Sequence, residues 1–264
     1  MAKILIIFVL VLFSLFAMPQ DFEVAPVLIN FKAESGTVQT TKLTVKNYAN
    51  IKQKFELKLS DYIIDENGAK KSMPVGTTDR SCANWLTVNP SFMELNPNES
   101  KQIDVIMTVP KAQGGTKWGM IHVQVAKEKT AIDADKDMAT GIIVVPRIVV
   151  LVKQSPKSNN NYSGKIEDLK EITKEGDDFR KFEAKLINDG DKVIDAKISL
   201  SVANIITAKE QKFKRKKFTV YPGHNRIITV TLPINLEPGK YAIAVIMDYG
   251  HRKAIEGVQM IIEQ

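Results

Sequence analysis

The residue types that most often carry catalysis are few and widely separated in this chain of 264 residues. The three histidines, His122, His224 and His251, do not stand at the spacing of metal ligands or of a nucleophile and its base. His122 lies within an alternating apolar segment and the other two lie beside turn residues, so we expect structural or surface roles. No catalytic residue is predicted, and enzyme activity is disfavoured.

Cys82 is the only cysteine, so the chain cannot form an internal disulfide. Because it stands close to Trp85, we expect a small buried apolar side chain rather than a reactive thiol. Burial raises a thiol pKa and suppresses its nucleophilicity. Stability must then come from hydrophobic cores.

Asp133, Asp135 and Asp137 have the spacing of the first three ligands of a calcium-binding loop. Met138 follows where such a loop needs glycine, and Val144 stands where it needs a bidentate glutamate. Too few oxygen ligands remain to complete the site. We therefore expect a solvated charged loop, with no metal.

The densest run of charge lies near the middle of the second half of the chain. Its cations are Lys212, Lys214, Arg215, Lys216 and Lys217. Lysines on a strand edge commonly guard it against pairing with another sheet, and this is one interpretation. The other is a contact for acidic headgroups or an acidic protein, in keeping with a formal net charge of +7.

Alternation with a period of two predicts that these side chains stand on β-strands. Apolar residues alternate with mostly polar ones over residues 55–59, 103–109 and 194–202, as in half-buried antiparallel strands. Turn dipeptides separate the runs: Asn67-Gly68, Pro97-Asn98, Gly114-Gly115, Asp189-Gly190, Pro222-Gly223, Pro238-Gly239 and Tyr249-Gly250. This spacing predicts an all-β protein made of stacked sheets.

One segment departs from this alternation. Residues 141–153, GIIVVPRIVVLVK, are apolar at both parities, which is typical of a strand buried on both faces. Pro146 cannot donate to a ladder and favours an edge strand or a bulge. A long apolar edge strand would be a docking site for another chain.

The chain divides into an export segment and two globular parts. Residues 1–20 join Lys3 to an apolar run over residues 4–16 and then the small residue Ala17, which predicts a secretory signal peptide. A membrane anchor is the weaker alternative, because the run is shorter than the roughly 20 residues of a membrane span. The polar stretch around Pro156 predicts a linker. We expect domains at 21–154 and 162–264, joined by residues 155–161. The composition, 44% hydrophobic and 25% charged, is that of ordinary globular domains.

A family resemblance enters at residues 80–110, RSCANWLTVNPSFMELNPNESKQIDVIMTVP, and at residues 21–47, DFEVAPVLINFKAESGTVQTTKLTVKN. Together they resemble the N-terminal immunoglobulin-like domain of the PapD-like periplasmic pilus-assembly chaperones. The second half, with VYPGHNRIITVTLP and LEPGKYAIAVIMDYG, is similar to the C-terminal β-sandwich of two-domain envelope proteins of that plan. The resemblance implies two immunoglobulin-like β-sandwich domains in tandem.

In that family, the last strand of the first domain lends alternating apolar residues to a client subunit that lacks a strand. Ile142 and Val144 match the donor positions. The family also anchors the client's terminal carboxylate with two basic residues in the cleft between the domains. Here Asn30 or Phe31 matches the first anchor and Val149 the second, with Arg147 and Lys32 nearby. This departure favours a divergent relative with other clients.

We therefore predict a non-enzymatic protein of a bacterial periplasm or cell envelope that binds exported or envelope polypeptides. Strand addition would use Ile142, Val144, Arg147 and Val149 on the last strand of the first domain. The alternative is a structural or accessory component of an envelope, surface-appendage, secretion or motility assembly. No cofactor, metal or nucleic acid is expected, and the mature form should have no stable membrane span. The sequence leaves the oligomeric state open.

Overall fold

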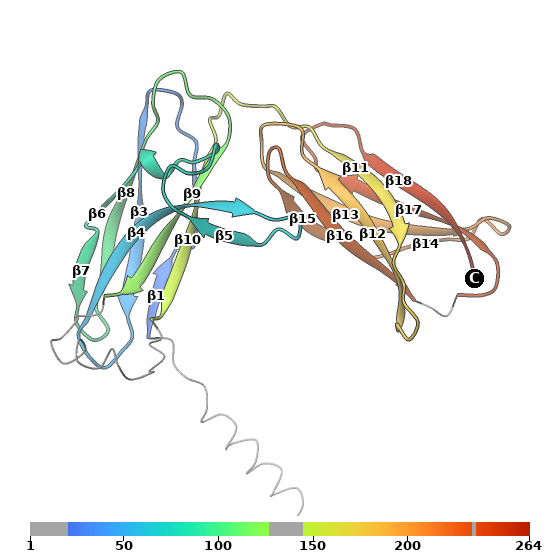
Figure 1. Cartoon of the computed structure of the whole chain (residues 1–264), viewed down its shortest axis with the longest axis horizontal. Helices are drawn as coiled ribbons and strands as arrows, with labels where there is room; N and C mark the ends of the chain where they lie inside the picture. The colour runs from blue at the N-terminus through green and yellow to red at the C-terminus, as the bar shows by residue number, and fades with distance from the viewer. Residues whose placement is uncertain (1–20, 127–144, 234–235) are drawn as a thin grey trace, which may run out of the picture.

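The computed structural model describes residues 21–126, 145–233 and 236–264. Strands make up nearly all of its regular structure, with one short 3₁₀ helix at Ala83–Trp85. They form two elongated sandwiches side by side (Figure 1). The all-β prediction is confirmed, because alternating residues give each strand one apolar and one polar face. No helix in the described part of the chain is long and apolar enough to cross a membrane.

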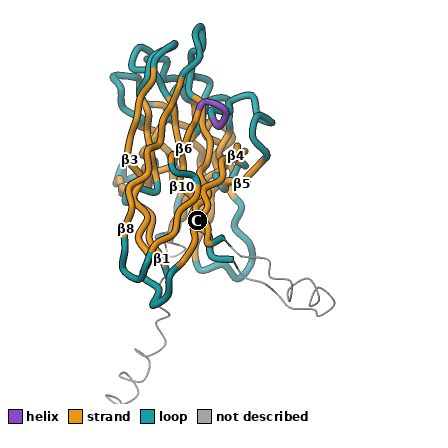
Figure 2. Tube along the Cα trace, turned by 90° about the vertical axis from the view of Figure 1, so that its left-hand side faces the viewer, coloured by secondary structure: helices purple, strands orange, loops and turns teal. Residues whose placement is uncertain are grey.

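The first sandwich is built from two sheets. The four-stranded sheet has the order β1-β3-β8-β6, with bounds Phe22–Ala25, Val38–Asn47, Ser100–Thr108 and Leu86–Asn89. The six-stranded sheet has the order β2-β10-β9-β4-β5, with bounds Leu28–Phe31, Arg147–Gln154, Lys117–Val125, Gln53–Ile64 and Lys70–Met73, and β7 (Phe92–Leu95) also pairs with β4. In Figure 2 the two layers separate, with β3 and β8 in one and β4 and β5 in the other.

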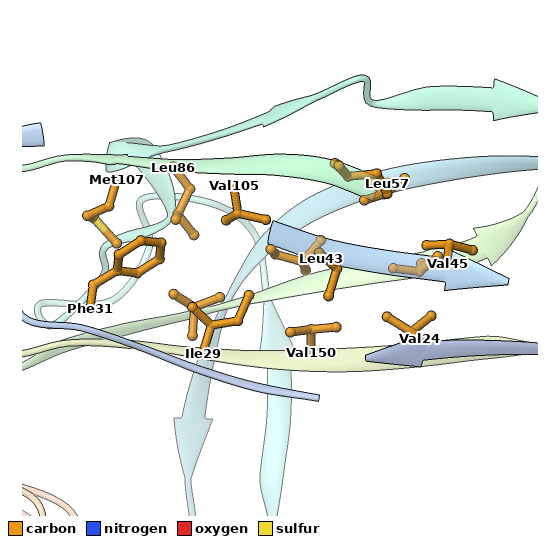
Figure 3. Close-up of a cluster of buried hydrophobic side chains, with 14 of the residues drawn as sticks. Val24, Ile29, Phe31, Leu43, Val45, Leu57, Leu86, Val105, Met107 and Val150 are labelled. Carbon is orange, nitrogen blue, oxygen red and sulfur yellow. The ribbon is translucent and has the colours of Figure 1, made fainter. Parts of the chain in front are cut away.

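The core of this sandwich lies between the two sheets. Side chains of β3 and β8, such as Leu43 and Val105, face Ile29 and Phe31 of β2 and Val150 of β10 (Figure 3). Each of these five side chains is at least nine-tenths buried, which contributes roughly 1.5–3 kcal/mol per residue. The core thus fixes the face that β10 turns inward.

The second sandwich repeats this plan. One sheet has the order β11-β12-β16, with bounds Lys165–Glu171, Phe179–Ile187 and Asn225–Pro233. The other has the order β14-β13-β17-β18, with bounds Glu210–Lys212, Ile194–Asn204, Lys240–Asp248 and Glu256–Glu263, and β15 (Lys216–Val220) also pairs with β13. A separate apolar core lies between these sheets and includes Phe182, Leu200 and Val245.

Direct contacts hold the two sandwiches together. Tyr62 and Trp118 of the first pack against Tyr221 of the second, and the two tyrosine hydroxyls lie 3.0 Å apart. At the tip of the β4–β5 hairpin, the Glu66 carbonyl accepts a hydrogen bond of 2.7 Å from the amide of Ile227. Figure 1 shows this hairpin reaching toward the second sandwich. A cleft lies between the two sandwiches beside these contacts, and the contacts make it a fixed part of the fold.

Candidate functional site

The strand β10 has different neighbours along its length. It pairs with β9 from Arg147 to Gln154, but its parallel partner β2 reaches only residues 151–154. Residues 147–150 therefore have β9 on one side and no strand on the other among the described residues. An unpaired row of this kind can accept an added strand.

The structure corrects the prediction of an edge strand along the whole of residues 141–153. The chain crosses between sheets after β1, and this brings β2 alongside the second half of β10. The Leu151 amide accordingly donates to the carbonyl of Val27 at 2.9 Å. Only the first half of the described strand is an edge. Ile142 and Val144 lie outside the described residues.

The two apolar faces of β10 have separate partners. Val150 and Val152 point into the core of the first sandwich and are fully buried. Val149 and Leu151 point the other way and pack against the aromatic cluster between the sandwiches. The apolar residues at both parities therefore arise largely from burial on both faces.

The cleft between the sandwiches holds a pocket of about 420 Å³ with a cationic lining. Lys32 and Lys153 from the first sandwich, Lys157 from the connection and Lys192 from the second all line it. No aspartate or glutamate stands among its lining residues. Such a pocket favours a negatively charged group.

Lys153 is the most enclosed of these cations. It pairs in register with Asn30 of β2 and with Trp118 of β9, and its Nζ lies 5.9 Å from the centroid of the Tyr221 ring. Burial lowers the pKa of Lys153, partly offset by the charge of Asp195. Burial also lowers the pKa of Lys192. Neither lysine forms a salt bridge within the described part of the chain.

The residues at the family's anchor positions can be located relative to this pocket. Asn30 and Phe31 both line the pocket, but the Phe31 side chain is buried in the core and only Asn30 is exposed. Val149 packs against the aromatic cluster, and Lys153, four residues later on the same face, lines the pocket instead. Lys32 does lie at the pocket. Lys153 is the one cation that follows the apolar run on the face of Val149 and Leu151, and this position in the sequence could have indicated that it lines the pocket.

Arg147 lies at the exposed start of β10 and its Nε donates to Gln124 Oε1 at 2.9 Å. A second pocket, of about 340 Å³, adjoins it and includes His122, Ser60 and Ser72. His122 Nε2 lies 2.7 Å from Ser60 Oγ and 3.2 Å from Ser72 Oγ. Its buried Nδ1 has no hydrogen-bond partner among the described residues, so no acid completes a Ser–His–acid triad. Burial, and then Arg147, lower the pKa of His122 and favour its neutral form.

The remaining predicted residues do not line this pocket, although His224 contacts Trp118 of the aromatic cluster with ring centroids 5.7 Å apart. Lys212 is on β14, Lys214 and Arg215 are in the gap before β15, and Lys216 and Lys217 begin β15; all five are exposed. His224 and His251 lie in turns, as expected. The candidate calcium loop with Asp133, Asp135 and Asp137 lies outside the described residues. Elsewhere in the described chain, no group of three metal-ligating side chains occurs.

Comparisons with known proteins bear on the fold. No protein-family model matches the chain, and no curated protein matches it in sequence. One chain of the chaperone–tip adhesin complex that activates CFA/I fimbriae biogenesis superposes with a TM-score of 0.50 and 14% sequence identity, over 92% of this chain and 98% of that chain.

Two other solved structures are similar over the same extent. They are the class 5 fimbriae chaperone CfaA, with a TM-score of 0.48 and 14% identity over 91% of this chain and 98% of that chain, and a chain of the CsuC–CsuE chaperone–tip subunit complex of Acinetobacter baumannii, with a TM-score of 0.47 and 10% identity over 91% and 98%. At these identities the likeness concerns the fold. The chain has the two-domain fold of the PapD-like chaperones.

Proposed function

We propose that this chain is a periplasmic, non-enzymatic, chaperone-like protein that binds partner polypeptides by strand addition at β10. The observation that carries the proposal is the open side of β10 at residues 147–150, beside a cleft lined by lysines. A partner strand added there would form backbone hydrogen bonds with β10. The likeness in fold to one chain of a chaperone–tip adhesin complex supports this role.

The two parts of the site would recognise different parts of a partner. Even-numbered residues of β10 face the sandwich core, so Ile142 and Val144 have the parity to continue that row into the core of an added partner. The pocket lined by Lys32, Lys153, Lys157 and Lys192, which we call the lysine pocket, would receive an anionic group. Every polypeptide has such a group in its terminal carboxylate. Lys153 and Lys32 would hold it through charge-assisted hydrogen bonds.

The test replaces Ile142 and Val144 with Asp in the exported, tagged chain and identifies co-purifying proteins by mass spectrometry. We expect the partners to be lost while the fold remains, because two carboxylates cannot enter an apolar core. Ile255→Asp/Ile261→Asp is the matched control, since both isoleucines are exposed on the second sandwich. An unchanged partner set in the folded Ile142→Asp/Val144→Asp variant would refute strand addition.

A fractionation experiment addresses the structural alternative. A chaperone should be recovered in the periplasmic fraction and should bind its partners transiently. Permanent recovery with purified envelope complexes would instead favour a structural component and would contradict the proposal.

A further inference from the structure

The second sandwich has an exposed cationic edge that the proposed function does not use. After β13 the chain turns at residues 205–208, and β14 and β15 then run back along β13. Neither β14 nor β15 has a strand on its other side among the described residues. We call this surface the basic edge, and its cations are Lys209, Lys212, Lys214, Arg215, Lys216 and Lys217.

Most of this charge is not neutralised within the chain. Lys212 lies 3.4 Å from Glu210 and Lys217 lies 3.2 Å from Asp195. The other four cations form no salt bridge with any described residue. Guarding a strand edge against pairing would account for the cations alone.

Two apolar features accompany the cations. Ile205 and Ile206 form the tip of the hairpin and are 48% and 84% exposed. The side-chain oxygen of Asn204 accepts hydrogen bonds from the amides of Ile206 and Thr207 at 3.0 and 2.9 Å, which orders the turn. Two isoleucines are therefore presented to solvent on a fixed tip.

The second apolar feature is a hollow of about 190 Å³ at the gap between β14 and β15. Ile198, Leu200, Phe213 and Val230 line it, together with Lys214 and Lys216. Both lysines are exposed, whereas Ile198, Leu200 and Val230 belong to the buried core. An apolar interior with cations beside it matches an anionic amphiphile, such as an acidic lipid.

We propose that the basic edge docks on the surface of an anionic lipid bilayer. The isoleucine tip enters the boundary between headgroups and acyl chains, while the lysines and Arg215 meet the lipid phosphates. An acidic protein would satisfy the charges but would give no reason for two exposed isoleucines on an ordered tip. Figure 1 places β14 at the end of the second sandwich that lies away from the first, whereas β15 lies near the β4–β5 hairpin of the first. This inference does not depend on the proposed function.

The test is co-sedimentation of the mature chain, purified after export, with phosphatidylcholine vesicles that contain about one third phosphatidylglycerol. We expect binding that weakens as salt is raised, because the cations act through screened charges. Lys214→Gln/Arg215→Gln/Lys216→Gln should weaken binding by at least about tenfold. Ile205→Ser/Ile206→Ser should weaken it also, without changing the net charge.

Two matched variants are the controls. Lys71→Gln/Lys101→Gln/Lys111→Gln removes three exposed lysines from the first sandwich, and Ile51→Ser removes an exposed isoleucine there. Both should bind vesicles as the unmodified chain does, and thermal melts should confirm that all variants fold. Equal sedimentation with pure phosphatidylcholine vesicles, equal loss in the control variants, or binding to a polyacidic protein but not to vesicles would each overturn the proposal.

Discussion

Lys153 is a partly buried cation in a pocket that no aspartate or glutamate lines. Replacing it with Met should leave the fold as stable or slightly more stable at neutral pH, by less than about 1 kcal/mol, because a desolvated charge is removed. The same change should weaken partner binding, because the pocket loses its most enclosed cation. Urea denaturation measures the first effect, and partner co-purification measures the second.

The effect on stability should depend on pH. The folded-state pKa of Lys153 lies below its ordinary value of 10.5, so at neutral pH both the folded and the unfolded chain carry the proton and the fold bears the full cost of the buried charge. As the pH rises through the lowered pKa toward 10.5, the folded state releases its proton first and this cost disappears. The advantage of Lys153→Met should therefore shrink. Lys197→Met on the exposed surface is the control and should show no such trend.

Cys82 should react only when the first sandwich unfolds. Its side chain is 0% exposed, and burial raises the pKa of its thiol, so the reactive thiolate is both rare and inaccessible. We expect labelling by a thiol-specific chromogenic reagent to follow the urea unfolding curve measured by circular dichroism. Rapid labelling of the native protein would contradict the burial of this residue.

Residue types alone predicted the surroundings of some side chains better than those of others. The expectation that Cys82 is a buried apolar residue is confirmed. Trp118 is buried too, but among aromatic residues between the two sandwiches rather than in either domain core. Tyr221 comes from more than one hundred positions further along the chain. No local pattern indicates such a neighbour.

At the scale of elements, alternation and turn chemistry predicted the strands well. Residues 55–59, 103–109 and 194–202 coincide with parts of β4, β8 and β13, apart from one terminal residue. Each of the seven turn dipeptides lies between strands. The pairing of β2 with the second half of β10 could not be predicted, because it is parallel and joins residues about 120 positions apart.

The β4–β5 hairpin contains a glycine that both its own turn and the second sandwich require. Gly68 has a φ of +78°, and a Cβ there would collide with the guanidinium of Arg226. That guanidinium donates to the Thr219 carbonyl at 3.0 Å. Gly68→Ala should therefore cost about 1 kcal/mol for the backbone conformation, and more for displacing Arg226.

Gly176→Ala separates these two effects. Gly176 has a similar φ of +87°, but nothing lies within 4 Å of a Cβ placed there. Its substitution should cost only the backbone contribution. Equal losses of unfolding free energy in the two variants would show that Arg226 adjusts freely to the new methyl group.

At the scale of the whole molecule, polar contacts help to set the relative placement of the sandwiches. Arg80 forms a salt bridge with Asp191 and also donates to the Thr116 carbonyl at 3.2 Å. Thr116 Oγ1 in turn donates to the Asp191 carbonyl at 2.6 Å. These contacts lie beside the lysine pocket, which includes Thr116. The shape of the pocket therefore depends on this interface.

The paired tyrosine hydroxyls offer a direct measure of coupling between the sandwiches. Burial raises the pKa of both Tyr62 and Tyr221, so the pair stays protonated and neutral at physiological pH. Tyr62→Phe should cost about 1–2 kcal/mol, because it leaves the Tyr221 hydroxyl buried without its partner. Tyr221→Phe should cost a similar amount.

The double variant Tyr62→Phe/Tyr221→Phe should cost less than the sum of the two single variants, because no unpaired hydroxyl then remains. In a Trp85→Phe background, Trp118 fluorescence can report the interface, since its ring centroid lies 5.0 Å from that of Tyr221, while circular dichroism reports the strands of both sandwiches. If the interface couples the sandwiches, the two probes should give coincident unfolding curves in the unmodified chain. In the single variants the fluorescence transition should come first, because the interface separates before the two cores unfold. Strictly additive losses, with coincident curves in every variant, would mean that the hydroxyl pair contributes nothing to holding the sandwiches together.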